Sequence, residues 1–381
     1  MTRYWTVNGR FLTQRMTGVQ RYGRETVLAL DRLIHEGHPL ARDLAVEILV
    51  PAGAAPLPDL RAISVREAQG LSGHLWEQIV LPLWSRGRIL SLCNTSTVIG
   101  RRQIVCIHDL NVFLFPQSYS RGFRLLYRLL LPLLGRVSRT IATVSHFSAE
   151  QIARARITGP DKIVIAPNGH EHALRWGPGA PVTAEGDRDT VVVLGSLAPH
   201  KNIATLLKIA PDLAASGLRL AIVGNKEAHV YGDAGLERNA AGAVWMGSLS
   251  DQELSALLAR SLCLAFPSLT EGFGLPPLEA MAIGCPVVVS DRASLPEVCA
   301  DAALYAPALS PDRWYEAIMR LHRNPALRAE MVERGRLRAT HFSWQRSAEI
   351  YLDAMAQADG IVPVRRPAEE RADARAELAP G

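Results

Sequence analysis

Short apolar runs alternate with longer amphipathic segments along most of this chain. The apolar runs have the length of buried strands and lie at 4–7, 46–50, 89–92, 103–107 and 140–144, and again at 191–194, 219–223, 243–246, 262–266 and 286–290. Apolar residues at helical spacing fill the segments between them. Strands that alternate with helices are typical of parallel sheets with helices on both faces. The pattern therefore predicts an α/β protein.

The two sets of strands are separated by a polar stretch at 177–189 that is rich in Gly, Pro, Ala and Asp. Such a composition is typical of a linker, and 381 residues exceed what one ordinary core holds. We therefore predict two Rossmann-like domains, 1–175 and 176–340. A helix is predicted over 341–358, and the tail at 359–381, with few large apolar residues, is predicted to be disordered.

Composition and charge narrow the classes of partner without choosing one. The net charge of +5 is compatible with a nucleotide, a nucleic acid or an anionic lipid. Because the basic residues are dispersed and no recognised motif is present, we expect no nucleic-acid partner. No apolar run approaches the roughly 20 residues that cross a bilayer, so we expect a cytoplasmic or peripheral protein. The five cysteines form no C-x-x-C pair, which argues against a zinc site or a disulfide framework.

Two carboxylates, Glu271 and Glu279, flank a turn in the segment F-P-S-L-T-E-G-F-G-L-P-P-L-E at 266–279. Pro276 and Pro277 suit the first turn of a helix, which we expect to include Glu279 as well. The N–H groups and the dipole of a helix start attract an anion such as a diphosphate. Carboxylates accept hydrogen bonds from hydroxyls, so the pair suits the two polyols of a nucleotide-diphospho-sugar. The alternative is a surface loop followed by a helix with an acidic first turn.

A second motif, G-S-L-A-P-H-K-N at 195–202, lies between an apolar strand and a helical segment. Lys201 is placed to neutralise a diphosphate, and Asn202 is placed to cap the helix. The alternative is a solvated lysine at a helix start. The carboxylates at 271 and 279 favour the phosphate interpretation.

In the first half of the chain, two segments place polar residues after predicted strands. M-T-G-V-Q-R-Y at 16–22 opens a helix, where Gly18 permits the close approach of a ligand and Arg21 is available to phosphate. V-C-I-H-D-L at 105–110 ends a strand with His108 and Asp109, at the sheet edge where catalytic side chains collect. The alternatives are a surface arginine at 21 and a structural histidine at 108.

The segment at 266–279 resembles the Glu-x7-Glu signature of family 4 retaining glycosyltransferases, which have the GT-B fold. Further similar segments are H-L-W-E-Q at 74–78, T-V-S-H-F-S at 143–148, A-P-N-G at 166–169 and F-S-W at 342–344. Many members carry an arginine after the first glycine or before the lysine, where this chain has Ser196 and His200. The resemblance implies that the two domains face a central cleft and that the helix at 341–358 returns to the first domain.

The resemblance also implies roles for individual residues. It places Glu271 and His108 at the transferred hexose as catalytic residues, and Glu279 at the ribose of the donor. Further donor contacts are implied for Lys201, Gly18, Ser196, Phe273, Gly274 and Leu275. Asp109 and Arg21 are implied in acceptor or other contacts.

The implied activity is retaining transfer of a hexose from a nucleotide-diphospho-sugar to a hydroxyl of a glycan or lipid-linked acceptor, in surface polysaccharide or glycolipid synthesis. GDP-mannose is the first donor to test, by likeness to mannosyltransferases of the family. No cofactor is expected, because the nucleotide-sugar is a substrate. The D-x-D at 187–189 formally fits a metal motif, but its place in a polar linker argues against a metal. Alternatives are a sugar-nucleotide epimerase of the same fold and a non-catalytic scaffold protein.

The segment at 121–139, R-G-F-R-L-L-Y-R-L-L-L-P-L-L-G-R-V-S-R, combines arginines with a leucine face. The pattern favours a core helix with solvated arginines, bent at Pro132. The alternative is a helix that lies on the inner face of the cell membrane, which makes an anionic membrane surface a candidate partner.

Overall fold

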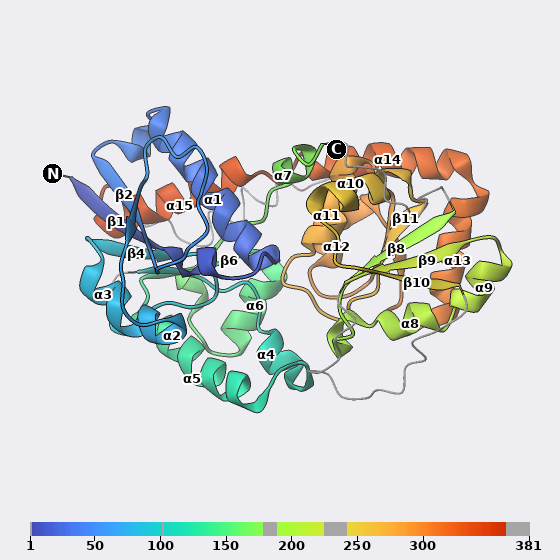
Figure 1. Ribbon diagram of the computed structural model, residues 1–381, viewed down its shortest axis with the longest axis horizontal. Helices are drawn as coiled ribbons and strands as arrows, with labels where there is room; N and C mark the ends of the chain where they lie inside the picture. The colour runs from blue at the N-terminus through green and yellow to red at the C-terminus, as the bar shows by residue number, and fades with distance from the viewer. Residues whose placement is uncertain (1, 101–102, 178–188, 225–241, 363–381) are drawn as a thin grey trace. The chain divides into compact units, whose positions relative to one another are not determined.

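The computed structural model describes residues 2–100, 103–177, 189–224 and 242–362 (Figure 1). The chain divides into two compact units. Met1–Leu110, Tyr127–Pro167 and Trp344–Gly381 form the first unit, and Asn111–Leu126 and Asn168–Ser343 form the second. Most of the predicted linker at 177–189 and of the predicted disordered tail lies outside the described residues.

In its described part, the first unit is built on a parallel sheet of seven strands in the order β3-β2-β1-β4-β5-β6-β7. The strands are β1 (Arg3–Asn8), β2 (Leu44–Val50), β3 (Ser64–Glu67), β4 (Arg88–Ser91), β5 (Ile104–Cys106), β6 (Thr140–Thr143) and β7 (Ile163–Ile165). The helices are α1 (Gly18–His35), α2 (Gly73–Leu75), α3 (Leu81–Trp84), α6 (His146–Arg154) and α15 (Trp344–Asp359), with a π-helical stretch, Trp76–Val80, between α2 and α3. Helices α1 and α15 pack together, and the hydroxyls of Tyr22 and Tyr351 lie 2.9 Å apart.

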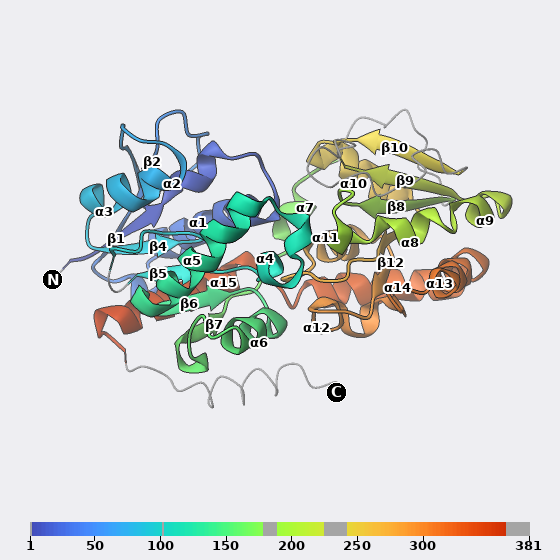
Figure 2. The same cartoon turned by 90° about the horizontal axis from the view of Figure 1, so that it is seen from below.

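The second unit repeats this architecture with six described strands in the order β10-β9-β8-β11-β12-β13, of which β10, β9 and β8 follow one another plainly in Figure 2. The strands are β8 (Thr190–Leu194), β9 (Arg219–Val223), β10 (Ala243–Gly247), β11 (Cys263–Phe266), β12 (Val287–Ser290) and β13 (Leu304–Ala306). The helices are α4 (Asn111–Leu114), α7 (Glu171–Leu174), α8 (Ile203–Leu207), α9 (Ala210–Ala215), α10 (Asp251–Arg260), α11 (Leu275–Ile283), α12 (Leu295–Cys299), α13 (Pro311–Arg323) and α14 (Pro325–Ala339).

Both described sheets have the strand order of a doubly wound Rossmann fold, and the predicted fold class is confirmed. In such a sheet the order reverses beside the first strand, and ligands bind outside the carboxyl ends of the strands at that switch point. The switch point lies between β1 and β4 in the first unit and between β8 and β11 in the second. Residues that directly follow these four strands are therefore the first candidates for a functional site.

Each unit buries its own apolar residues. In the second unit the β8 to β9 core includes Val191, Val193 and Leu220, and Trp314 of α13 is fully buried against it. In the first unit Trp76 packs with Leu49 and Leu81, and its indole N–H donates to the Ala68 carbonyl at 3.0 Å. No helix in the described part of the chain combines the length and apolar character that crossing a bilayer requires.

The segment Asn111–Leu126 lies between strands of the first unit in sequence but belongs to the second unit. Its contacts give the physical reason. The Ser118 hydroxyl lies 3.0 Å from Nδ1 of His200, and the Tyr119 ring stacks on the His200 ring with a centroid distance of 6.5 Å. Helix α5 (Arg121–Val137) consequently begins in the second unit and ends in the first. The prediction placed one boundary near residue 175 and returned the chain to the first domain with the helix at 341–358, and it kept 111–126 in the first domain.

Candidate active site

The second switch point brings Lys201 and Glu271 together. Lys201 lies after β8 and Glu271 lies after β11, on the two strands that flank the reversal. The Lys201 Nζ donates to Oε1 of Glu271 at 2.7 Å, with 25% of the lysine side chain and 12% of the glutamate side chain exposed. Two residues that the sequence placed seventy positions apart thus form one partly exposed ion pair at the edge where ligands bind.

The loop that carries Lys201 is fixed by Asn202. This residue takes a left-handed backbone conformation, with φ of +53°, at the N-terminus of α8. Its side-chain amide donates to the carbonyls of Pro267 at 3.0 Å and Ala308 at 2.7 Å. The sequence predicted an N-cap, and Asn202 does occupy that position, but its side chain makes no capping bond. The amide instead joins the Lys201 loop to the loop after β11.

A tight turn sets the start of α11. Gly274 has φ of +102°, a conformation that side chains disfavour, and a Cβ there would lie 2.7 Å from Cδ2 of Leu295. The Ser294 hydroxyl reaches the carbonyls of Glu271 at 3.0 Å and Phe273 at 2.8 Å and holds the turn from the other side. The backbone angle therefore favours glycine at this position, and a Cβ there would also require the Leu295 side chain to shift.

The predicted anion site at this helix start has fewer donors than an ordinary helix. Helix α11 begins at Leu275, so Pro276 and Pro277 occupy its second and third positions. Proline has no N–H group, so two of the four amides that a helix start normally presents are absent. A diphosphate here must rely on the amides of the loop and of Leu275, and on the charge of Lys201.

Glu279 lies deeper than predicted. It is the fifth residue of α11, beyond the first turn in which the sequence placed it, and only 6% of it is exposed. Nε2–H of His172 donates to its Oε1 at 2.8 Å, and the His172 ring meets the edge of Trp176. The carboxylate is thus oriented by a buried histidine from α7. Sequence analysis missed His172.

The other predicted donor residues of the second unit lie on the same two loops. Ser196 is partly buried, and its hydroxyl accepts from the Ala198 amide at 3.4 Å. The Phe273 ring is buried and packs edge-on against Phe342, so its backbone is what the loop can offer a ligand. Leu275 is also buried.

His200 does not supply the positive charge that an arginine at this place carries in many similar proteins. Burial, together with the charge of Lys201, lowers the pKa of His200 to about 4. The ring is therefore neutral at pH 7. His200 instead contacts Ser118 and Tyr119, and it thereby joins the segment 111–126 to the Lys201 loop.

His108 follows β5 in the first unit and is also neutral. Burial lowers its pKa to about 4, and Nε2–H donates to the Leu92 carbonyl at 2.8 Å. The ring meets Tyr22 edge-on at a centroid distance of 4.7 Å, and its backbone N–H donates to Oδ1 of Asn94 at 2.8 Å. Because Nε2 holds the proton, Nδ1 is left as a hydrogen-bond acceptor. His108 is suited to accept a hydrogen bond from a hydroxyl and unsuited to act as a cation.

The remaining predicted residues of the first unit are accessible to different degrees. Gly18 is the exposed first residue of α1, where Thr17 occupies the N-cap position. Arg21 lies on the same first turn, and Asp109 follows His108, each partly exposed.

Sequence analysis missed a buried polar cluster at the first switch point. Glu77 is 1% exposed, and its carboxylate accepts hydrogen bonds from Nδ2 of Asn8 at 2.8 Å and from the Thr95 hydroxyl at 2.9 Å. Nε of Arg10 lies 3.0 Å from the same carboxylate, and Nδ1 of His74 lies 3.1 Å from it. Burial raises the pKa of Glu77, but the bonds from His74, Asn8 and Thr95 and the charge of Arg10 outweigh it and hold the pKa below its usual value. The cluster is a preorganised polar surface. Its only sequence signal was H-L-W-E-Q at 74–78.

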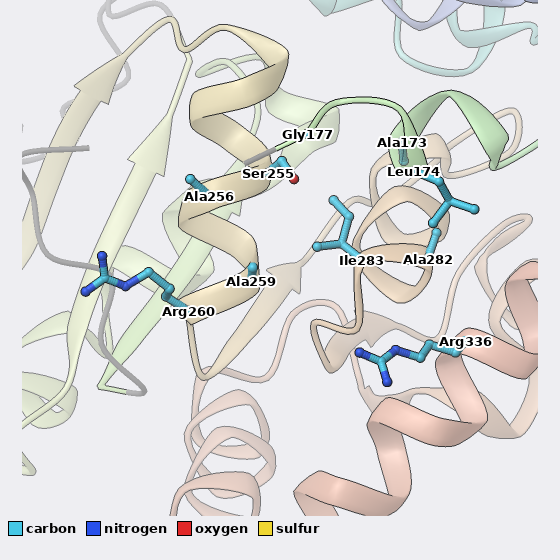
Figure 3. A pocket seen from close by; sticks show the side chains of 10 residues that line it. All are labelled: Ala173, Leu174, Gly177, Ser255, Ala256, Ala259, Arg260, Ala282, Ile283 and Arg336. Carbon is cyan, nitrogen blue, oxygen red and sulfur yellow. The ribbon is translucent and has the colours of Figure 1, made fainter. Parts of the chain in front are cut away.

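A cavity of about 520 Å³ in the second unit lies elsewhere (Figure 3). Small residues of α10 and the end of α11 line it, together with Arg260 and Arg336, and none of the predicted site residues does. In the described part of the chain no three His, Cys, Asp or Glu side chains come together as metal ligands, and Asp187 of the D-x-D lies outside the described residues.

Comparison with known proteins gives the class. Residues 180–338 match the family model of the glycosyl transferases group 1. The chain is 26% identical to the O-antigen chain mannosyltransferase RfbU of Salmonella typhimurium, over 61% of this chain and 65% of that protein. It is 28% identical to the O-antigen chain mannosyltransferase B of Escherichia coli, over 64% and 67%. A sucrose-phosphate synthase from Thermosynechococcus elongatus has a similar fold, with a TM-score of 0.70 and 17% identity over 95% of this chain and 100% of that one.

The second unit therefore carries the region that is similar to the group 1 glycosyl transferases, and the chain has the GT-B fold that the sequence predicted. The chain matches about two thirds of the length of the two curated relatives. The ion pair of Lys201 and Glu271 and the buried pair of His172 and Glu279 both lie within or directly beside the matched region.

Proposed function

We propose that this protein is a family 4 glycosyltransferase that moves a hexose from a nucleotide-diphospho-sugar to a hydroxyl of a glycan or lipid-linked acceptor, with retention of configuration. The observation that carries the proposal is the Lys201 to Glu271 ion pair at the switch point of the second sheet. A cation is available there for the diphosphate, and a carboxylate is available for sugar hydroxyls.

Different groups hold the diphosphate and the ribose of the donor. Lys201 and the backbone amides around Gly274 meet the diphosphate, and Glu279, oriented by His172, accepts the ribose hydroxyls. When the diphosphate reaches Lys201, Glu271 is released to accept the hydroxyls of the hexose. Stabilisation of the departing diphosphate by Lys201 then supplies most of the catalysis, without a metal ion or another cofactor.

We assign binding of the acceptor to the first unit. We assign Nδ1 of His108 to accept a hydrogen bond from a hydroxyl of the transferred hexose. Arg10 and His74, both partly exposed and anchored on buried Glu77, are further candidates for contact with the acceptor. The acceptor proton passes to an oxygen of the leaving phosphate on the same face of the sugar, which gives the retained anomer.

Mannose from GDP-mannose is the first donor to test, because the two curated relatives described above are named as O-antigen mannosyltransferases. The same names support a role in surface polysaccharide synthesis. Such an activity belongs on the cytoplasmic face of the cell membrane, where we place the protein as a peripheral enzyme.

The test is a thermal-shift panel of GDP-, UDP- and ADP-sugars, with and without EDTA, followed by a transfer assay with the donor that stabilises the protein. A ligand that binds the native state at one hundred times its dissociation constant stabilises by about 2.7 kcal/mol. We expect one nucleotide-sugar to raise the melting temperature in EDTA and nuclear magnetic resonance of the product to show the donor's anomeric configuration. No shift with any nucleotide-sugar or free nucleoside diphosphate would refute the proposal.

A further inference from the structure

Five segments of distinctive sequence meet in one buried cluster of the first unit. The cluster is centred on Tyr22 of α1, which is 0% exposed, and on the ring of His108. Its other members are Ser148, Ala166 and Trp344, and each of the five residues comes from a different segment. Of these five residues only His108 has an assigned contact with substrate. The contacts of the other four show what the cluster does.

Tyr22 holds the imidazole of His108. The two rings meet edge-on, with a centroid distance of 4.7 Å and an interplanar angle of 85°, which is a favoured arrangement of aromatic rings. Nε2–H of the imidazole donates to the Leu92 carbonyl at 2.8 Å. The carbonyl fixes the direction of Nε2, and the Tyr22 ring limits rotation of the imidazole about that hydrogen bond. The direction of Nδ1, the acceptor atom, is thereby set as well.

Tyr22 is itself anchored by residues from other elements. Its hydroxyl donates to the Ala166 carbonyl at 2.9 Å and lies 2.9 Å from the hydroxyl of Tyr351. The ring of Trp344 meets the Tyr22 ring edge-on at a centroid distance of 5.6 Å. Burial raises the pKa of the Tyr22 hydroxyl well above its usual value, so the hydroxyl keeps its proton at pH 7. Tyr351 and Trp344 both belong to α15, which packs against α1 (Figure 1).

The backbone of His108 is fixed without Tyr22. Its N–H donates to Oδ1 of Asn94 at 2.8 Å, and its carbonyl accepts from the Ser148 hydroxyl at 2.9 Å. Loss of the Tyr22 ring should therefore leave the backbone of His108 in place and free the imidazole alone. The orientation of one side chain can thus be separated from the packing of the surrounding core.

We propose that Tyr22 is a positioning residue that holds the His108 imidazole with Nδ1 in one direction. Helix α15 supports Tyr22 through Tyr351 and Trp344, and it thereby contributes to the hexose site although it does not touch the hexose. The inference rests on the proposed contact of His108 with the hexose. The orientation of the imidazole can be measured without any substrate, so the two can be tested separately.

The experiment compares Tyr22→Leu, which removes the ring, with Tyr22→Phe, which removes only the hydroxyl. Because displacement of a reacting group by about 1 Å can cost about a hundredfold in rate, we expect Tyr22→Leu to lower kcat for hexose transfer at least about tenfold. Tyr22→Phe keeps the ring contact and should retain most of the activity. Calorimetry should show unchanged binding of the donor's nucleoside diphosphate in both variants, because Lys201 lies in the second unit.

Nuclear magnetic resonance gives a readout that needs no substrate. Long-range proton–nitrogen correlation spectra of the full chain with isotope-labelled histidine report which ring nitrogen holds the proton, and His108→Gln assigns the signals of His108. The unaltered protein and Tyr22→Phe should show one tautomer of His108, with the proton on Nε2. Tyr22→Leu should show averaged shifts of the two ring nitrogens, because the freed imidazole exchanges between orientations.

Leu30→Ala is the matched control, because Leu30 is also 0% exposed on α1 but lies about two turns beyond Tyr22. It destabilises the core through a cavity and should change neither kcat nor the spectrum of His108. Should Tyr22→Leu fail to fold, Tyr22→Met gives the same test, because methionine fills more of the space.

The proposal is overturned if the folded variant without the ring loses no more kcat than Leu30→Ala, or if it keeps the single tautomer of His108. If the unaltered protein transfers no hexose, the proposed function fails, and the spectra alone then decide whether Tyr22 positions His108.

Discussion

Replacement of Glu271 by glutamine separates the two functions that we assign to the Lys201 to Glu271 ion pair. Glutamine keeps the size of the side chain and removes its charge. Lys201 then has no carboxylate 2.7 Å away to compete with a diphosphate. We expect Glu271→Gln to bind a nucleoside diphosphate more tightly than the unaltered protein and yet to lose hexose transfer, because the carboxylate that accepts the hexose hydroxyls is gone.

The size of the effect follows from the geometry. Two unit charges at 2.7 Å attract by about 6 kcal/mol at an effective dielectric constant of about 20, and by about 1.5 kcal/mol at that of water. Both side chains are partly exposed, so solvent offsets most of the larger figure. About 1 to 2 kcal/mol should remain, which corresponds to about 5- to 30-fold tighter binding of the diphosphate.

The assay is isothermal titration with GDP, or with the diphosphate of whichever donor the thermal-shift panel identifies, alongside the transfer assay. The control is Glu316→Gln, because the Arg313 to Glu316 pair has the same 2.7 Å separation but is exposed to solvent in α13. It should leave both binding and transfer unchanged. Near-normal turnover by Glu271→Gln, or weaker diphosphate binding in a variant that melts normally, would refute the reasoning.

Three further predictions test other parts of the structure. Gly274→Ala should lower stability by about 1–3 kcal/mol in thermal unfolding, because alanine is strained at φ of +102° and its Cβ meets Leu295; an unchanged melting temperature contradicts this. His172→Ala should weaken donor binding about tenfold by removing the hydrogen bond that orients buried Glu279, and His172→Gln should restore part of the affinity; equal affinities in calorimetry would show that His172 has no such role. His108 and His200 each have a pKa of about 4 in the folded protein, against 6.5 in the unfolded chain. Because the unfolded chain takes up protons first as the pH falls, the free energy of unfolding should be at its full value above about pH 6.5 and should fall by about 3 kcal/mol per histidine as the pH drops toward 4. Urea unfolding between pH 7.5 and 4.5 measures this loss, which should be smaller in His200→Phe and is absent if the histidines are not buried neutral.

The ten strands that the sequence predicted are all present, because each carries a run of apolar residues; the sheets bury most of these runs, and the edge strand β10 is buried only in part. The strands that it missed have weaker patterns. β3, Ser64–Glu67, is an edge strand with mostly exposed side chains, and β7 and β13 have three residues each. These segments become strands because a neighbouring strand offers them backbone hydrogen bonds, and that information is not local.

The site divides in the same way. Lys201 and Glu271 could be predicted because each lies in a motif with glycines and prolines that fix the local backbone. His172 could not, because it meets Glu279 across 107 positions of sequence and nothing beside it in the chain is distinctive. The neutrality of His200 likewise depends on burial against Ser118 and Tyr119, which belong to a segment 82 residues earlier. The sequence therefore predicted the residues that lie in local motifs, and it could not predict contacts between residues that only the fold brings together.

Because Asn111–Leu126 belongs to the second unit, the units of this protein cannot be exchanged with those of a relative at a single junction. A chimaera that joins its second unit to the first unit of a relative at one junction near residue 168 would leave His200 without Ser118 and Tyr119. The Lys201 loop would then lose one of its supports even though every residue of the matched family region was retained. Exchange of donor specificity between relatives should therefore require a graft in two pieces, 111–126 and 168–343, and substitutions that arise in one piece should be compensated in the other.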